Sequence, residues 1–272
     1  DEAVISFGTS LAVSESGQYL VIGSPFYSNS KFSNQGQVRI YEHASGRHEW
    51  VRIGDPIDGG ANDDWLGWSV AILEASPLTV VTSAPHSLAT GGYVTSYQYD
   101  GVDWQRNGTI ANKNGTTDDY FGSFLSLTHT GTVLRLAIGS PFTDNGSFKD
   151  VGATIVYDFD NNQWNQVGLP ITFTGANEQA GHYIKLLGSG NLMLMGCPGY
   201  KNQAGAVKLF RWNDVEFVED GLFLERSNGQ DFGVALDATR RSDDDRLVLV
   251  VGALSGVDGG PGMAHIGQVG DL

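Results

Sequence analysis

The stretch LAIGSPF (Leu136–Phe142) decides the fold, because nearly the same seven residues, LVIGSPF (Leu20–Phe26), occur 116 residues earlier in the chain. In both copies an apolar run of the kind that forms a buried strand ends at Gly and Pro, which commonly mark turns. Two occurrences of the same predicted strand and turn indicate a repeated structural unit. Such repetition predicts that the fold is an array of similar units.

Four markers recur in a constant order and extend the repeat to the whole chain. The first is an apolar residue followed by glycine, at Gly8, Gly67, Gly122, Gly181 and Gly233. The second closes an apolar run 15 to 19 residues later, at Gly23, Ser83, Gly139, Gly196 and Gly252. The third is a glycine with an aromatic residue five positions on, at Gly36, Gly92, Gly152 and Gly205. The fourth is an aromatic residue with glycine four positions on, at Trp50, Trp104, Trp164 and Phe217.

Each repeat predicts four strands: a short one, a continuous apolar one, an alternating one and one that carries the fourth marker. A four-stranded unit of about 40–60 residues repeated around an axis is a β-propeller blade. A tandem pair of β-sandwiches is the competitor, but the repeat is too short for a sandwich of about 100 residues. We predict an all-β chain, a single β-propeller domain over residues 1–272. Its five blades are expected at about 6–60, 61–114, 115–175, 176–225 and 226–272.

The last repeat lacks the fourth marker. Residues 1–5, DEAVI, precede the first marker and can pair as the outer strand of the last blade. Such pairing would remove an exposed sheet edge and close the ring. The alternative is a truncated chain without its closing strand. Closure by residues 1–5 is the interpretation that we favour.

Charge and composition limit the classes of function. The net charge of −15, from 31 acidic and 16 basic residues, argues against a nucleic-acid partner, since phosphate contacts need a basic surface. No apolar stretch is long enough for a transmembrane segment. Cys197, the only cysteine, stands in an apolar run, which predicts a buried and unreactive thiol.

Three sequons make Asn107, Asn114 and Asn145 candidate glycosylation sites. The chain also opens on Asp1 without Met, as a processed chain would. Both observations predict an extracytoplasmic protein, either secreted or associated with the cell surface. The lumen of an organelle is the alternative.

The apolar-Gly marker before the first strand and the Gly-Ser-Pro marker after the second strand resemble the FG-GAP repeat, best known from the propeller head of the integrin α subunit. The resemblance covers nearly the whole chain. The aromatic residue and glycine after the third strand look more like the secreted repeat proteins of microbes and algae. The resemblance implies a propeller that engages partners through its loops. Five repeats are fewer than in the integrin head, so blade number and ligand stay open.

Integrin-type repeats often hold calcium between the first two strands, because alternating Asp residues supply the several oxygen ligands that this cation needs. The corresponding turns here read SESGQ, EASPL, THTGT and GSGNL, and they cannot supply such a set. The fifth turn, Asp237–Asp245, contains acidic residues at a different spacing with two arginines between them. We therefore predict no cofactor and no metal, calcium included.

Two recurring residue types have both a functional and a structural interpretation. Acidic residues precede the first marker, at Asp64, Asp119, Glu178 and Asp231. They would form either a ring of carboxylates or acceptors for backbone amides of the turn, and their recurrence favours the second role. Three tryptophans of the fourth marker would either stack on sugars or pack between blades, and packing is favoured for Trp50, Trp104 and Trp164. No catalytic motif stands out, so we predict no catalytic residue and no enzymatic activity.

The loops after the second strands differ between repeats. They carry aromatic and cationic residues in an otherwise acidic chain, a composition typical of a contact surface. Together with two residues in the connections between blades, the candidate partner-binding residues are Tyr27, Lys31, Phe32, Trp65, Tyr120, Phe148, Lys149, Tyr200 and Lys201. The alternative is that these side chains fold back onto their own loops.

The predicted function is a non-enzymatic module that binds a protein partner, in adhesion or recognition or as an accessory subunit of a larger assembly. One alternative is a lectin-like propeller that binds glycans in equivalent pockets between blades. Another is a glycosidase, which would need two carboxylates in unequal environments within a central pocket.

Overall fold

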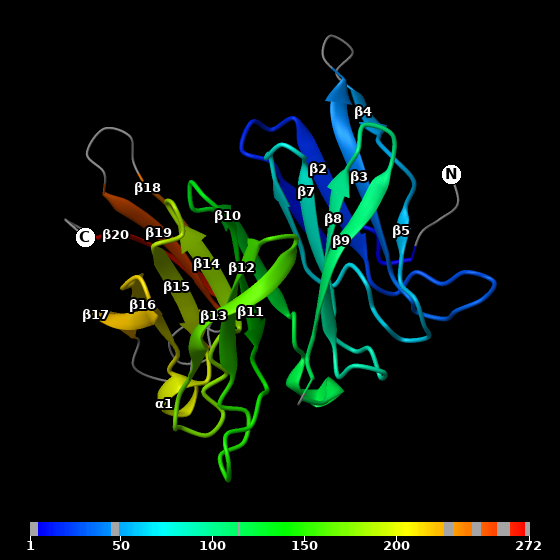
Figure 1. Cartoon of the computed structure of the whole chain (residues 1–272). Coiled ribbons are helices and arrows are strands. Elements are labelled where there is room, and N and C mark those ends of the chain that lie inside the picture. The colour runs from blue at the N-terminus through cyan, green and yellow to red at the C-terminus, as the bar shows by residue number, and fades with distance from the viewer. Residues whose placement is uncertain are drawn as a thin grey trace. The chain divides into compact units, whose positions relative to one another are not determined.

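The computed structural model of the protein describes residues 5–44, 49–113, 115–225, 231–240, 246–254 and 262–269. Within those residues nearly all regular structure is β-strand (Figure 1). The exceptions are a 3-10 turn, η1 (Thr117–Asp119), and one helical turn, α1 (Tyr200–Gln203). Neither of these described helical turns is long and apolar enough to cross a membrane. The prediction of an all-β chain is confirmed.

Within the described residues the strands form five sheets, in which strands adjacent in sequence pair with one another, with one exception in the first sheet. The first sheet contains β1 (Ser10–Val13), β2 (Tyr19–Ser24), β3 (Gln37–Ala44), β4 (Glu49–Arg52) and β5 (Ile57–Asp58), and there β5 pairs with β3. The second contains β6 (Val70–Leu73), β7 (Thr79–Ala84), β8 (Tyr93–Tyr99) and β9 (Trp104–Ala111). The third contains β10 (Phe124–His129), β11 (Leu134–Ser140), β12 (Ala153–Asp160) and β13 (Gln163–Thr172). The fourth contains β14 (Tyr183–Leu187), β15 (Leu192–Cys197), β16 (Ala206–Trp212) and β17 (Phe217–Glu225). The fifth contains β18 (Ala235–Arg240), β19 (Leu247–Ala253) and β20 (Met263–Val269).

The duplicated stretch of sequence forms the second strand of its sheet, β2 in the first copy and β11 in the second. The strands β7, β11 and β15 are buried at every position. A second strand has a hydrogen-bonded neighbour on each side and is covered on both faces, so its sequence is continuously apolar instead of alternating. This burial explains why the repeat is most visible there.

The first two markers are the places where neighbouring sheets come into backbone contact. The hydroxyl of Ser10 in β1 donates a hydrogen bond to the carbonyl oxygen of Gly67, 2.7 Å away. A β-carbon at Gly23 would overlap that same oxygen, and a β-carbon at Gly139 would overlap the carbonyl oxygen of Gly181. At Gly23 and Gly139 the second marker is therefore glycine, because the next sheet occupies the space of a side chain.

The third marker also joins one sheet to the next. Gly36 forms a parallel bridge with Leu66, which stands just before the following first marker. The pairs Gly152–Ala180 and Gly205–Phe232 repeat this bridge. Gly36 has φ +80°, a left-handed conformation that favours glycine, and a β-carbon there would also overlap the backbone of Leu66.

The fourth marker pairs an aromatic ring with the glycine of the preceding sheet. The indole of Trp104 donates from Nε1 to the carbonyl oxygen of Ile53 at 3.0 Å, and its Cδ1 would lie 2.6 Å from a β-carbon at Gly54. Trp164 contacts Gly108 in the same way. The packing interpretation is confirmed for both residues. Trp50 differs: it is 42% exposed and its ring lies 5.3 Å from that of His43 in its own sheet.

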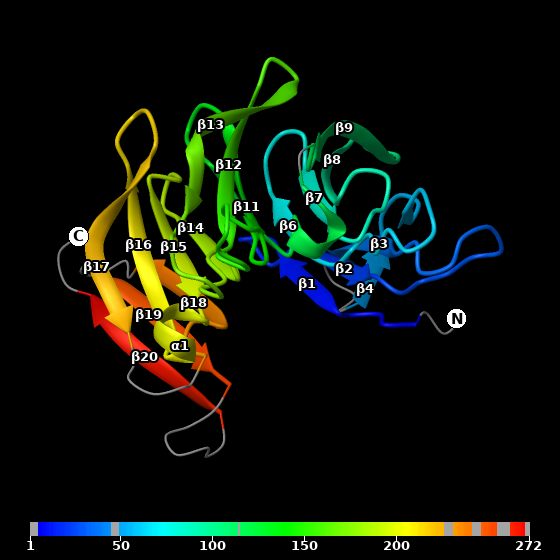
Figure 2. The ribbon, with the colours of Figure 1, turned by 90° about the horizontal axis from the view of Figure 1, so that it is seen from below.

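The chain divides into two compact units. The N-terminal unit comprises Asp1–Leu127 with Phe159–Trp164, and the C-terminal unit comprises Thr128–Asp158 with Asn165–Leu272. Among the described residues of the N-terminal unit, a buried apolar cluster lies around Ile40, Leu66 and Val80. In the described part of the C-terminal unit, one such cluster lies around Leu194 and Leu249 and another around Met195 and Phe210. Within the C-terminal unit, β14, β15, β16 and β17 lie side by side (Figure 2).

The fifth sheet contains three strands among the residues that the structure describes. Residues 1–4, predicted to supply its fourth strand, lie outside the described residues. Closure of the last blade by residues 1–5 therefore stays a prediction.

Candidate binding site

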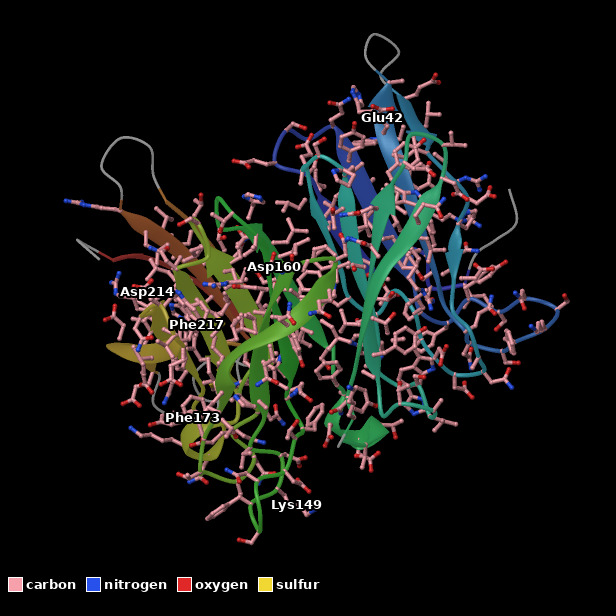
Figure 3. The ribbon with its side chains drawn as sticks, viewed as in Figure 1. Glu42, Lys149, Asp160, Phe173, Asp214 and Phe217 are labelled. Carbon is pink, nitrogen blue, oxygen red and sulfur yellow. The ribbon has the colours of Figure 1, made fainter. Side chains whose placement is uncertain are left out.

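Of the predicted contact residues, those between β11 and β12 lie on a loop of the C-terminal unit. Phe148 is 45% exposed. Lys149 forms an ion pair with Asp144 of the same loop, and this pair raises the pKa of Lys149 and lowers that of Asp144. Figure 3 shows Lys149 on this loop, away from the strands. The loop thus presents an aromatic side chain beside an amine that is already paired.

Two more predicted residues lie in α1 of the C-terminal unit. Lys201 forms an ion pair with Glu225 of β17 at 2.7 Å. The ring of Tyr200 packs against a buried cluster and lies 5.2 Å from Nζ of Lys208, a lysine that is only 7% exposed. Both residues therefore serve the stability of their own sheet.

Three predicted residues lie in the long loop between β2 and β3, which folds back onto itself. The side chain of Asn29 accepts hydrogen bonds from the backbone N–H groups of Lys31 and Phe32 at 2.8 and 2.9 Å. Nζ of Lys31 stands 4.6 Å from the centroid of the Phe32 ring. The carbonyl of Tyr27 accepts the N–H of Gly36 at 3.0 Å. These contacts match the folded-back alternative.

Trp65 and Tyr120 behave differently, because their rings meet although 55 residues separate them. Their centroids lie 6.4 Å apart, and three further rings among the described residues of the N-terminal unit contact them. We call this group the aromatic cluster; its members are Phe26, Trp65, Trp68, His86 and Tyr120. All five residues are partly exposed.

The centre of the aromatic cluster is a stack of three rings. His86 lies 4.0 Å from Trp65 with an angle of 11° between the planes, and Trp68 lies 5.6 Å from Trp65 at 22°. Phe26 and Tyr120 meet Trp68 edge-on, at 6.4 and 6.2 Å. Nδ1 of His86 lies 3.2 Å from the carbonyl oxygen of Asp63, which holds the imidazole in place. These are favourable aromatic geometries, so the rings are held rigidly.

A recurring turn explains how Trp65 and Tyr120 reach the surface. Both have positive φ, 59° and 52°, and in both turns the N–H three residues later donates to their carbonyl. The equivalent residues of the other repeats adopt the same conformation, at Ser6, Gln179 and Asp231. A left-handed backbone disfavours bulky side chains and costs about 1–3 kcal/mol, and such conformations cluster at functional sites. Tryptophan and tyrosine at this position thus indicate a function.

Sequence reasoning missed three members of the aromatic cluster. Phe26 and His86 directly follow the Pro of the second marker, and Trp68 directly follows the Gly of the first. Because these three residues directly follow recurring markers, they were interpreted as part of the repeated framework of the fold and not as contact residues. The available signal was that a constant backbone position carries a different side chain in each repeat.

The recurrent acidic residues bind the backbone, as the structural interpretation predicted. Asp64 is 3% exposed and accepts N–H groups from Gly60 and Ala61, each at 3.0 Å. Asp119 accepts the N–H of Thr116 at 2.8 Å. Burial raises the pKa of Glu178, and a hydrogen bond from the backbone of Gly175 opposes this rise. The prediction of amide acceptors is confirmed for these three residues.

The described residues contain no group of three His, Cys, Asp or Glu side chains that could hold a metal ion. Most of the acidic turn, Arg241–Asp245, lies outside the described residues. Burial raises the pKa of the Cys197 thiol to about 12, so the thiol stays protonated at neutral pH. The prediction of a buried cysteine is confirmed.

The sequons occupy different surroundings. Asn145 is exposed, and its side chain donates to the carbonyl of Phe173 at 3.3 Å. Asn107 lies in β9 and is partly exposed. Asn114 lies outside the described residues. Glycosylation of all three stays a prediction.

Known proteins resemble this chain in structure only. No protein-family model matches the chain, and no curated protein matches its sequence. An endo-arabinase from Bacteroides thetaiotaomicron aligns over 100% of this chain and 99% of its own, with 12% identity and a TM-score of 0.51. The Aleuria aurantia lectin in complex with Fucα1-6GlcNAc aligns over 96% and 78%, with 12% identity and a TM-score of 0.54. The GH93 α-L-arabinofuranosidase of Fusarium graminearum with arabinobiose aligns over 95% and 80%, with 11% identity and a TM-score of 0.55.

The comparisons correct one prediction. The sequence analysis excluded enzymatic activity, and this exclusion was wrong, because two of these three structures are enzymes. It rested on the lack of a local catalytic motif, whereas a site on such a fold is assembled from loops of separate blades. The FG-GAP resemblance stays a prediction. The five sheets and the structural likeness together show that the chain is a five-bladed β-propeller.

Proposed function

We propose that the protein binds carbohydrate at the aromatic cluster. The observation that carries the proposal is the convergence of five partly exposed rings from loops of successive repeats. Carbohydrate-binding sites need flat apolar surfaces for the C–H faces of sugar rings and a few polar groups for the hydroxyls. Stacked Trp, His and Tyr rings supply the surface, and their N–H and O–H groups supply polar edges.

The comparisons support this ligand class. The lectin structure contains Fucα1-6GlcNAc, and the arabinofuranosidase structure contains arabinobiose. All three compared proteins are named for binding or acting on sugars. The proposal matches the lectin alternative of the sequence analysis, with one difference. It uses one cluster of unlike residues in place of equivalent pockets between all blades.

A glycan array tests the proposal, followed by titration calorimetry with the glycan that binds best. Trp68→Ala and Tyr120→Ala are each expected to weaken binding by about tenfold or more, since each removes one of the rings that form the surface. Trp50→Ala is the matched control, because Trp50 is an exposed tryptophan of the same unit outside the cluster. No binding to any glycan, or equal losses in the control, would contradict the proposal.

The same glycan is then incubated with the protein and the products are separated by chromatography, because two of the compared structures are enzymes. Cleavage that is lost in Trp68→Ala would make the aromatic cluster a substrate site. Binding without cleavage would make it a recognition site. Cleavage that persists unchanged in Trp68→Ala would place the reaction elsewhere and count against this site.

A second candidate function is contact with a protein partner at the loop between β11 and β12. The observation that favours it is Phe148, a large aromatic side chain that is 45% exposed next to paired charges. Apolar centres with charged rims are typical of protein interfaces. Crosslinking in a native extract tests it: Phe148→Ala should lose a partner that the wild type and Leu88→Ala both retain. Leu88 is the control because it is 71% exposed on another loop.

A further inference from the structure

One buried residue, whose backbone pairs next to that of Trp65 in the aromatic cluster, has a side chain with unpaired polar atoms. Gln35 is 1% exposed, and neither its Nε2 nor its Oε1 has a hydrogen-bond partner within the described part of the chain. The indole N–H of Trp65 is also buried without an acceptor among those residues. Buried polar groups are nearly always paired, so each exception needs an explanation such as a water molecule or a ligand.

Backbone hydrogen bonds place these unpaired groups in adjacent segments. The N–H of Trp65 donates to the carbonyl of Asn34 at 3.2 Å, and the N–H of Leu66 donates to the carbonyl of Gln35 at 3.0 Å. The bridge between Gly36 and Leu66 continues the same pairing. Gln35 therefore lies alongside the residue at the centre of the ring stack.

Gln37 shows what a purely structural glutamine looks like in the same segment. It is 3% exposed, its Nε2 donates to Asp58 at 2.8 Å, and its Oε1 accepts Nε of Arg39 at 2.7 Å. A buried glutamine at this place in the fold is thus able to pair both ends of its amide. Two residues earlier, Gln35 pairs neither end of its amide with any residue that the structure describes.

The charge around the aromatic cluster indicates which ligands it accepts. Asp63 and Asp64 directly precede Trp65, and Asp118 and Asp119 directly precede Tyr120. Carboxylates this near in sequence repel an anionic ligand and leave a neutral one unaffected.

We infer that the aromatic cluster takes an uncharged sugar ring, and that the Gln35 amide and the Trp65 indole N–H bind one of its hydroxyl groups. This inference rests on the proposed carbohydrate binding and specifies its ligand. A hydroxyl both donates and accepts, and an amide offers one group of each kind. A site with buried polar groups also rejects a ligand that lacks the hydroxyl, because those groups would then stay unpaired.

Three variants test the inference. Gln35→Met keeps the length of the side chain and removes the amide, Trp65→Phe keeps a ring and removes the N–H, and Gln37→Met is the matched control. The wild type is first screened on an array of neutral glycans, Fucα1-6GlcNAc and arabinobiose included, and of glycans ending in uronic or sialic acid. Affinity for the best neutral glycan is then measured by calorimetry, and stability by thermal melting.

Gln35→Met and Trp65→Phe are expected to weaken binding by about tenfold. Gln35→Met is also expected to keep the wild-type melting temperature, since its amide has no hydrogen bond to lose among the described residues. Gln37→Met is expected to lower the melting temperature and keep the affinity. If the wild type binds neutral glycans but Gln35→Met binds them equally well, the inference fails while the proposed function stands. The same holds if acidic glycans bind better than neutral ones. If the wild type binds no glycan at all, both fail.

Discussion

At Gly139 the backbone of the neighbouring sheet takes the space that a side chain would need. The duplicated stretch LAIGSPF therefore contains glycine for a contact between repeats and not for flexibility within its own strand. Gly252 occupies the same marker in the last repeat, but there the nearest atom to a β-carbon would be 3.5 Å away, an ordinary contact.

This difference predicts that one methyl group has unequal effects at equivalent positions. Gly139→Ala is expected to lower the free energy of unfolding by about 1–3 kcal/mol, because the added carbon must push the backbone of Gly181 away. Gly252→Ala should change it by less than about 0.5 kcal/mol. Urea denaturation of both variants measures the difference, and equal losses would show that the contact at Gly139 is not decisive.

Arg135, in β11 of the C-terminal unit, has a charge that is enclosed by its contacts. Its side chain is 7% exposed and binds Asp158 through two hydrogen bonds of 2.7 and 2.8 Å. It also donates to the carbonyl of Gly190 at 3.0 Å, and its guanidinium lies 4.1 Å from the centroid of the Trp212 ring. One residue thus connects the third sheet to the fourth within this unit.

Arg135→Met is expected to lower the free energy of unfolding by about 3–5 kcal/mol, because it leaves Asp158 largely buried without its partner. Arg211→Met is the matched control: Arg211 binds Asp220 through two nitrogens, but both side chains are about one-third exposed. Arg211→Met should lower the free energy of unfolding by less than about 1 kcal/mol. A loss at Arg135 no larger than that at Arg211 would refute the argument from burial.

At the scale of elements, neighbouring sheets contact each other at more than one place along their strands. Close to the turn between β1 and β2, Ser16 donates to Glu74, which follows β6, from its backbone N–H at 2.9 Å and from its hydroxyl at 2.7 Å. In the fourth strands, Trp104 rests on Gly54 of the preceding sheet. The four markers and these accessory contacts together fix how one sheet packs on the next within the N-terminal unit.

The Ser16 contact predicts a pH-dependent difference in stability. The two hydrogen bonds from Ser16 lower the pKa of Glu74 from its ordinary value of 4.5. A lowered pKa in the folded state stabilises the protein above the ordinary value, and this contribution is lost as the pH falls through the folded-state pKa. Glu74→Gln should therefore cost under about 1 kcal/mol at pH 7, because the carboxylate is exposed, and nothing at strongly acidic pH. Denaturation of both proteins across this range measures the effect, and a difference that grows with acidity would contradict it.

For the whole molecule, the net charge of −15 governs which partners approach. An uncharged sugar has no charge–charge interaction with the protein that salt could screen. Its affinity should then change by less than about twofold between low and high salt, whereas an anionic ligand would bind better as salt screens the repulsion. Calorimetry at two ionic strengths measures this dependence. A strong increase in affinity with salt would show that the ligand is anionic.

Much of the fold followed from the sequence because the contacts between repeats are made by the backbone, which restricts the residues allowed there. Gly36, Gly139 and Trp104 have counterparts in other repeats because each makes the contact between its own repeat and a neighbouring one. The candidate site was predicted only in part. Trp65 and Tyr120 were identified as contact residues for a protein partner, and Lys149 and Lys201 were identified beside them although each forms an ion pair with an acid of its own unit.

The sequence by itself determined the all-β class, the five repeats and the strands that are buried, because periodic packing leaves a periodic pattern of residues. Only the tertiary structure decided the site. Phe26, Trp68 and His86 join Trp65 and Tyr120 because successive sheets bring their loops together, and the unpaired amide of Gln35 is revealed only by its burial. A site used once leaves no period in the sequence, so its residues are found only when the contacts between repeats are known.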